Sequence, residues 1–241
     1  MKRFDGRAAD QLRPTRFQRR FTDNAEGSVL VEFGRTRVLC TVSAVPGVPS
    51  FQLNRREGWL TAEYSMLPGS VEGRKTREFG KRDGRSVEIQ RLIGRSLRAV
   101  TDVSAFPNWT LYADCDVLQA DGGTRTAAIT GSCVALYDAL QTLNSRGQLA
   151  HWAMRDWIAA VSVGIVAGKP ALDLNYGEDS EADVDMNVVA TGNGKIVEVQ
   201  ATAERQVFDR HEFNQMLDLA LAGIWKLHAL QKSAVEGGVP V

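Results

Sequence analysis

The sequence has few of the residues that form disulfide frameworks, zinc sites or hydrolytic triads. It contains three cysteines and three histidines in 241 residues. Cys40, Cys115 and Cys133 are odd in number, widely separated and set in apolar segments, without the paired spacing of zinc ligands. We therefore expect three buried, reduced thiols. The histidines stand in no catalytic spacing with serine, cysteine or aspartate, and His228, near the apolar face of a predicted helix, is interpreted as a packing residue.

Long apolar runs and net charge are also absent. No run reaches the ~18 residues that a membrane-spanning helix requires, and the first residues are charged and polar, unlike a signal peptide. Together with reduced thiols, these absences predict a cytoplasmic protein that does not associate with membranes. Lys and Arg number 29, as do Asp and Glu, but basic residues cluster in 13–20 and 74–98 and acidic residues in 173–185. These clusters, rather than the zero total, indicate where charged ligands can bind.

The apolar pattern predicts an α+β fold. With 44% hydrophobic residues the chain can build a sizeable core, and we expect a single domain over 1–241. Strands are predicted at 28–33, 36–42, 59–64, 110–120, 158–166, 171–174, 184–191 and 195–202, and helices at 85–100, 127–143 and 210–231. Residues 1–26 are polar, basic and rich in turn residues, and residues 65–84 are predicted to form a long exposed segment. Because strands come in hairpins with helices between them, mixed sheets are expected, and the similar hairpins after Gly27 and Asp183 suggest two halves.

The most informative motif is Asp121-Gly122-Gly123-Thr124-Arg125-Thr126, between a predicted strand and a helix of small apolar residues. Glycines allow a tight turn and a close approach of backbone N–H groups, and a helix N-terminus favours anions. Thr124 adds a hydroxyl and Arg125 a guanidinium fork, so the motif is suited to phosphate. The alternative is an ordinary turn with a threonine cap and a surface arginine, because short glycine motifs recur by chance.

A second candidate is the acidic segment 178–185. Its carboxylates are hard oxygen ligands of the kind that bind Mg²⁺ or Mn²⁺. Asp183 and Asp185 alternate with Val184, so they share one face if strand pairing begins there. The alternative is a solvated acidic loop.

Basic residues before and at the start of the helix at 85–100 form a third candidate. Arg85 stands at the helix start, where the dipole disfavours a cation, which fits an arginine directed at an anion. Glu88 is expected to pair with Arg85 or Arg91. The preceding basic loop is suited to a phosphate backbone, although a merely solvated loop is the alternative. Its residues are Arg74, Lys75, Arg77, Lys81 and Arg82.

Taken in order along the chain, these motifs resemble those of the ribonuclease PH family. The resemblance covers almost the whole length. The matching segments are residues 5–7, 26–30, 61–68, 84–85, 88–95, 119–126, 178–180, 185–188 and 198–200. Bacterial ribonucleases PH are phosphate-dependent 3′→5′ exoribonucleases, or tRNA nucleotidyltransferases, that trim tRNA precursors. The resemblance implies two similar β–α halves of the ribosomal protein S5 domain 2 type, and a homohexamer built as a trimer of dimers.

The resemblance also implies roles for individual residues. The family's phosphate-binding positions fall on Arg85, Gly123, Thr124 and Arg125. Its metal-linked and catalytic acids fall on Asp179 and Asp185, with Mg²⁺ or Mn²⁺ as cofactor and inorganic phosphate as co-substrate. Its tRNA-contacting loop falls on the segment that holds Arg74 and Arg77. Asp185 is expected to act as general acid, with a metal-bound water as the alternative proton donor.

Three positions depart from the family pattern. Gly69 replaces a frequent arginine and so removes one charge toward RNA. Asp183 replaces a common glutamate, and Ala201 a frequent glycine. The other function classes considered are a non-catalytic RNA-binding ring subunit, a hydrolytic nuclease and a structural assembly protein. Retention of the acids and of both arginines argues against the first and the third, and the phosphate motif argues against the second.

Overall fold

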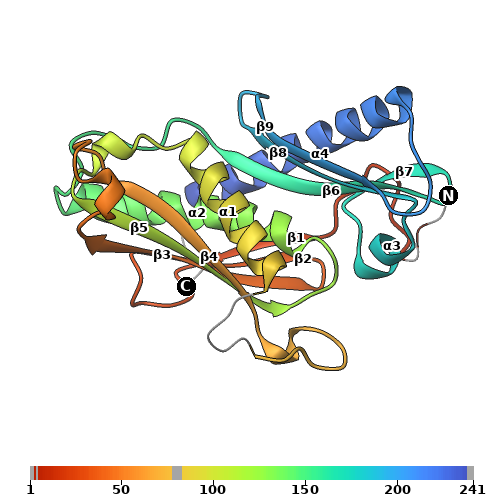
Figure 1. Ribbon diagram of the computed structural model, residues 1–241, viewed down its shortest axis with the longest axis horizontal. Coiled ribbons are helices and arrows are strands. Elements are labelled where there is room, and N and C mark those ends of the chain that lie inside the picture. Colours follow the sequence, from red (N-terminus) through yellow and green to blue (C-terminus); the bar gives the residue numbers. More distant parts are fainter. Residues whose placement is uncertain (1–2, 4, 78–82, 238–241) are drawn as a thin grey trace.

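The computed structural model describes residue 3, residues 5–77 and residues 83–237, and it has the expected α+β architecture (Figure 1). One sheet has five strands in the order β1-β2-β3-β5-β4. They are β1 (Thr15–Arg19), β2 (Gly27–Phe33), β3 (Thr36–Pro46), β4 (Trp59–Met66) and β5 (Trp109–Gln119). All neighbours are antiparallel except β4 and β5, which are parallel. The sheet is therefore mixed, as predicted.

The second sheet has four antiparallel strands in the order β7-β6-β8-β9. They are β6 (Ile158–Val166), β7 (Lys169–Leu172), β8 (Val184–Thr191) and β9 (Ile196–Ala203). The helices are α1 (Gly84–Ala99), α2 (Thr124–Ser145), α3 (Tyr176–Glu181) and α4 (Arg210–Glu236), with short 3₁₀ turns η1 (Ser50–Gln52), η2 (Pro68–Ser70) and η3 (Val103–Ala105). The two halves in Figure 1 thus each combine one sheet with helices.

Helix α2 holds the two halves together. It packs against β2 and β3 of the first sheet and against β6 of the second, and it is buried on nearly all sides. A Cβ at Gly131 would lie 2.5 Å from the Val31 side chain, so only glycine allows α2 to approach β2 this closely. Helix α1 packs on β4, and α4 on β6, β7 and β8. The small residues of α2 therefore let one continuous core extend into both halves.

Two elements lie where the sequence predicts none. Strand β1 has only Phe17 as a large apolar residue, and it exists because its backbone pairs with β2. Helix α3 lies in the acidic segment and begins with a capping box between Asn175 and Glu178. Glu178 is fully buried, so this part of the segment is not a solvated loop. Lys81 and Arg82 of the basic loop lie outside the described residues.

Several smaller predictions are confirmed. All three cysteines are free and buried. His228 is 5% exposed, and its Nδ1 lies 2.9 Å from Gln231 Oε1, which agrees with a packing role. None of the helices within the described residues combines the length and the apolar character that crossing a membrane requires.

Candidate active site

The glycine motif forms a tight loop between β5 and α2, as its sequence predicts. Gly122 and Gly123 have φ values of 74° and 65°, in the left-handed region that favours glycine. A Cβ at Gly122 would lie 2.7 Å from the backbone of both Leu174 and Asn175. The loop therefore packs directly against the chain that leads into α3, and α2 begins at Thr124 with its first N–H groups free of helical partners.

Thr124 and Arg125 are held by residues of other elements. The Tyr64 hydroxyl on β4 donates to Thr124 Oγ1 at 2.8 Å. Arg125 Nη1 lies 3.1 Å from Glu88 Oε1 of α1 and also donates to Gln200 Oε1 of β9. Glu88 thus pairs with Arg125, and the expected pairing with Arg85 or Arg91 is wrong, because α1 and α2 meet side by side. The Arg125 guanidinium is oriented before any ligand binds.

Arg85 lies at the start of α1, where Asp83 caps the helix by accepting from Ser86 N. Its side chain is exposed, and it has no ion pair with any residue in the described part of the chain. Its positive charge nevertheless lowers the pKa of Asp179, against the larger opposing effect of burial. The Arg85 guanidinium is therefore near enough to Asp179 for their charges to interact.

Asp179 on α3 and Asp185 on β8 are the two acids that the sequence predicts for the site. Burial raises the pKa of Asp179, while the charges of Arg85 and Arg125 oppose this effect. Burial, and then the Asp179 charge, raise the pKa of Asp185 to about 6. The two carboxylates are therefore close enough to interact.

The two acids fit a divalent cation, because they supply carboxylate oxygens and because one of these oxygens is buried without a hydrogen-bond partner. Asp185 Oδ2 accepts from Asn187 Nδ2 at 3.2 Å, whereas Oδ1 is buried without a hydrogen-bond partner. Two carboxylates match the number that Mg²⁺ commonly takes from protein, with the remaining ligands from water and phosphate. No cluster of three acidic, histidine or cysteine ligands is found among the described residues. Any metal site here would thus take its remaining ligands from donors other than acidic, histidine or cysteine side chains, such as water and phosphate.

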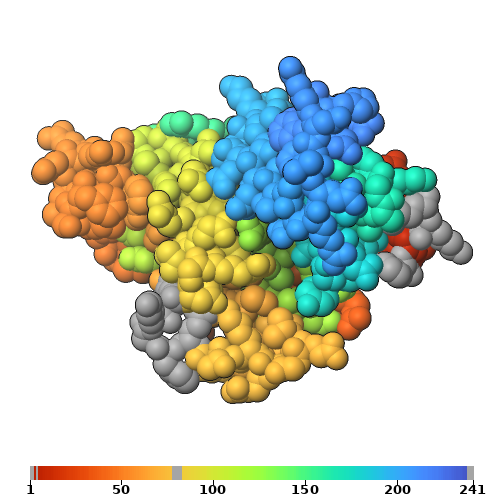
Figure 2. All heavy atoms as spheres, turned by 45° about the vertical axis from the view of Figure 1, so that its right-hand side comes forward, coloured from red at the N-terminus to blue at the C-terminus, as the bar shows by residue number. Residues whose placement is uncertain are grey.

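Arginines and acids meet in one cavity of about 320 Å³. Figure 2 shows one face of the molecule, on which a small green area lies between the yellow atoms of α1, the teal region that includes α3 and the blue segment after β9. The lining residues are Arg85, Gly123, Thr124, Arg125, Ser162, Asp179, Ser180, Ala182, Asp185, Asn187, Glu204 and Arg205. The structure thus brings together six of the eight sequence-predicted site residues.

The other two, Arg74 and Arg77, do not line the cavity. Both are exposed in the segment after η2, which Figure 2 shows below α1 in golden yellow. Lys75 in this segment pairs with Asp83 at 2.7 Å, next to the start of α1. Arg74 and Arg77 are thus exposed outside the cavity. Asp183 is also outside the lining, and it precedes β8, which begins at Val184, so the strand pairing on which the shared face with Asp185 depended does not include it.

Several lining residues were not predicted from the sequence. Ser180 and Asn187 lie within the matching segments 178–180 and 185–188, so their place in these motifs could have indicated a position at the site. Ser162 lies in a continuously apolar strand, and Glu204 and Arg205 follow a hairpin, so no local pattern marks them. Their position depends on how the second sheet faces α2.

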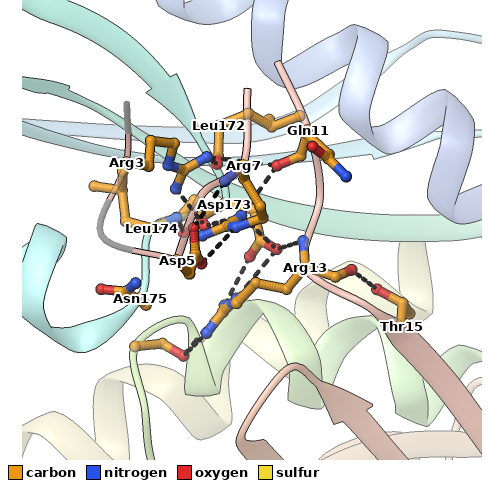
Figure 3. A network of polar contacts seen from close by, with 12 residues as sticks. Arg3, Asp5, Arg7, Gln11, Arg13, Thr15, Leu172, Asp173, Leu174 and Asn175 are labelled. Atoms are coloured by element: carbon orange, nitrogen blue, oxygen red, sulfur yellow. Dashed lines mark hydrogen bonds and ion pairs between the residues drawn. The ribbon is translucent and has the colours of Figure 1, made fainter. Parts of the chain in front are cut away.

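A largely buried network of ion pairs joins the N-terminal segment to the glycine loop and to α3 (Figure 3). Arg13 pairs with fully buried Asp173 at 2.7 Å, and its Nη1 donates to the carbonyl of Asp121 at 2.6 Å. Arg3 donates to Glu178 of α3, and Arg7 pairs with Asp5 and Glu178. Glu178, one of the acids of the candidate metal segment, is therefore a structural residue. The network connects the glycine loop with the helix that carries Asp179.

Comparisons with known proteins agree with this geometry. The family model described as 3′ exoribonuclease family, domain 1, matches residues 11–140, and that for domain 2 of the same family matches residues 156–223. The division falls between the two halves of the structure.

Solved structures share the fold over nearly the whole chain. Rice (Oryza sativa) Rrp46 has a TM-score of 0.79 at 21% identity, covering 97% of this chain and 100% of that chain. A chain of the Archaeoglobus fulgidus exosome with RNA bound to the active site has a TM-score of 0.78 at 24% identity, covering 95% and 92%. A chain of an archaeal exosome core has a TM-score of 0.76 at 24% identity, covering 96% and 91%. At these identities the likeness concerns the fold alone.

Proposed function

The chain belongs to the 3′ exoribonuclease family, and from this premise we propose that it is a phosphorolytic 3′→5′ exoribonuclease of the ribonuclease PH type. The proposed substrates are tRNA precursors and other RNA 3′ ends. The observation that carries the proposal is the shared cavity, in which an anion-binding helix start faces two partly buried acids. A hydrolytic nuclease has no need of a second anion site.

In the proposed reaction, inorganic phosphate is held by Arg85, Arg125 and the N-terminus of α2. A phosphate oxygen attacks the phosphorus of the terminal phosphodiester, and the bond from phosphorus to the 3′ oxygen breaks. The products are a nucleoside 5′-diphosphate and an RNA shorter by one nucleotide, whose 3′ oxygen takes up a proton. Two anions must approach each other, so catalysis depends mainly on charge neutralisation and positioning.

The acids have two proposed roles. Asp179 and Asp185 would hold Mg²⁺, or Mn²⁺, whose charge stabilises the scissile phosphate when the ion is bound. Asp185 is also the proposed source of the proton for the 3′ oxygen while its carboxyl is not bound to the cation, the state in which its pKa is raised. With the cation bound, the carboxylate stays ionised, and water would supply the proton. The reaction exchanges a phosphodiester for a phosphoanhydride bond, so the same site would add nucleotides from nucleoside diphosphates.

RNA binding beyond the cavity is proposed for the exposed Arg74 and Arg77. A homohexameric ring, as the family resemblance implies, would bring several such segments toward one RNA. Gly69 leaves one charge fewer in this region, and a Cβ there would meet no atom within 4 Å, so the fold would accept a larger residue.

Product analysis tests the proposal. The protein is incubated with Mg²⁺ and an RNA that carries extra 3′ nucleotides, with and without inorganic phosphate. Nucleoside diphosphates formed only with phosphate would support phosphorolysis. Nucleoside monophosphates formed without phosphate would establish hydrolysis instead, and RNA binding without any product would favour a non-catalytic ring subunit.

A further inference from the structure

The cavity contains a third arginine, Arg205, which has no role in the proposed reaction as described above. Arg205 lies in the turn that follows β9, in the second half of the molecule. Arg85 and Arg125 come from α1 and α2 and reach the cavity from the first half. Arg205 therefore approaches the site from the side of the two acids.

The turn that carries Arg205 is attached to the segment that carries the acids. The backbone N–H groups of Glu204, Arg205 and Gln206 all donate to the carbonyl oxygen of Asp183, at 3.0, 3.1 and 3.4 Å. Arg205 Nη2 donates to the carbonyl of Ser180 at 3.0 Å. Asp183 and Ser180 each lie within two residues of a cavity acid, so Arg205 is positioned relative to both acids.

The charge of Arg205 is not neutralised by a specific partner. Its guanidinium bonds a neutral carbonyl, and it has no ion pair within the described residues. Arg125, in contrast, is paired with Glu88. The Arg205 side chain is exposed, so an anion can reach it from solvent.

An anion that enters the cavity near Arg205 also meets three carboxylates. Asp179, Asp185 and Glu204 all line it, and the Glu204 charge raises the pKa of both other acids, behind the larger effect of burial. An RNA 3′ end that approaches these carboxylates brings further negative charge. The helix start and Arg125 are already assigned to inorganic phosphate, so the second anion requires a separate donor.

We propose that Arg205 binds the phosphodiester backbone at the 3′ end of the RNA, as a donor separate from those of the inorganic phosphate. This inference rests on the proposed function, because it assigns the second of the two anions in phosphorolysis. Arg205 thereby determines affinity for RNA and leaves affinity for phosphate to Arg85 and Arg125.

Steady-state kinetics separate the two affinities. Phosphorolysis of an oligoadenylate is measured with RNA and phosphate varied independently. For Arg205→Ala we expect KM for RNA to rise about tenfold, as for loss of a charge-assisted hydrogen bond, with KM for phosphate within about twofold of wild type. Arg125→Ala, in the proposed phosphate site, should show the opposite split. Arg210→Ala, which removes an exposed arginine five residues away and outside the cavity lining, is the matched control and should change neither constant.

Conservative variants of Arg205 distinguish an effect of its charge from an effect of its hydrogen bond to the Ser180 carbonyl. Arg205→Lys keeps the cation and should restore most of the RNA affinity. Arg205→Gln keeps a donor for the Ser180 carbonyl without the charge and should not. Recovery in Arg205→Gln, or a rise confined to KM for phosphate, would overturn the inference.

Equilibrium binding gives a readout that is independent of turnover. Fluorescence anisotropy of labelled oligoadenylate without phosphate should give weaker binding for Arg205→Ala and a salt dependence reduced by about 0.7 in slope, as for one contact to single-stranded RNA. An unchanged dissociation constant would contradict the assignment. Wild-type protein that binds RNA but forms no diphosphate would instead refute the proposed function, whatever the Arg205 variants do.

Discussion

The surroundings of Asp185 make its ionised form costly for folding, and the proposed chemistry depends on the same carboxyl group. Its side chain is mostly buried beside a second carboxylate, and one of its oxygens lacks a partner. Burial, and then the charge of Asp179, penalise the ionised form and raise the pKa of Asp185 to about 6 from the ordinary 3.8. A bound cation would remove this penalty, so the residue is better adapted to the loaded site than to the empty one.

Stability should therefore depend on pH through this residue. Because its folded-state pKa is raised, the favourable contribution is fully present below pH 4 and is lost as pH rises through about 6. In metal-free buffer we expect Asp185→Asn to unfold with a free energy up to about 3 kcal/mol higher than wild type at pH 8, and with no such gain at pH 4. Urea denaturation across this pH range measures it.

The same variant should lose turnover while it gains stability. Asp183→Asn is the matched control, because Asp183 lies two residues away and outside the cavity lining. That control should keep activity and show no comparable pH-dependent gain. A stability gain in Asp185→Asn that is equal at all pH values would contradict the electrostatic explanation.

At the scale of elements, the loop between β5 and α2 packs closely against the chain before α3 because Gly122 has no side chain. The left-handed conformation of Gly122 is shared by Gly147, which follows α2 with φ 67°. The two sites differ in their surroundings. A Cβ at Gly147 meets no atom within 4 Å, whereas one at Gly122 would lie 2.7 Å from backbone atoms.

Alanine at these two glycines separates conformational strain from crowding. We expect each variant to lose about 1 kcal/mol from backbone conformation. Gly122→Ala should lose about 1–3 kcal/mol more, because backbone atoms must move to admit the methyl group. It should also raise KM for phosphate, since the loop shifts, while Gly147→Ala should leave KM unchanged. Equal losses of stability in the two variants, measured by chemical denaturation, would show that crowding at Gly122 is relieved without cost.

At the scale of the whole molecule, the network in Figure 3 joins the N-terminal segment to both halves. Arg13 bonds Asp173 after β7 in the second half and the Asp121 carbonyl in the first. Both side chains of the ion pair are at most 3% exposed, so neither can be solvated if its partner is lost. The network therefore ties the positions of the two sides of the cavity to each other.

Removal of Arg13 should accordingly lower the free energy of unfolding. We expect Arg13→Ala to lose about 3–5 kcal/mol of unfolding free energy, since it leaves Asp173 buried without its principal partner. Arg37→Ala, which breaks the exposed pair with Glu32, should lose less than about 1 kcal/mol. Guanidinium denaturation compares the two variants. A loss from Arg13→Ala no larger than that from Arg37→Ala would mean that water replaces the missing guanidinium.

Local patterns in the sequence were sufficient for most elements and for the motifs of the site. The hairpin around Gly34, the periodic helices and the paired glycines each follow from interactions within a few residues, which one sequence window contains. Strand β1 could not be found in this way, because its evidence lies in its pairing with β2. The bounds of α2 and α4 were also predicted short, since their ends depend on contacts with other elements.

The sequence by itself determined the residue chemistry: a glycine-rich helix start with an arginine, an acidic segment and an exposed basic loop. Only the tertiary structure decided which of these act together. It placed Arg125, Asp179 and Asp185 in one cavity with Arg205, and it assigned Glu178 to a buried pair with Arg3, 175 residues away. The physical reason is that burial and charge pairing depend on neighbours in space. Two adjacent acids, Glu178 in a buried ion pair and Asp179 in the cavity lining, therefore have different surroundings that their sequence context does not distinguish.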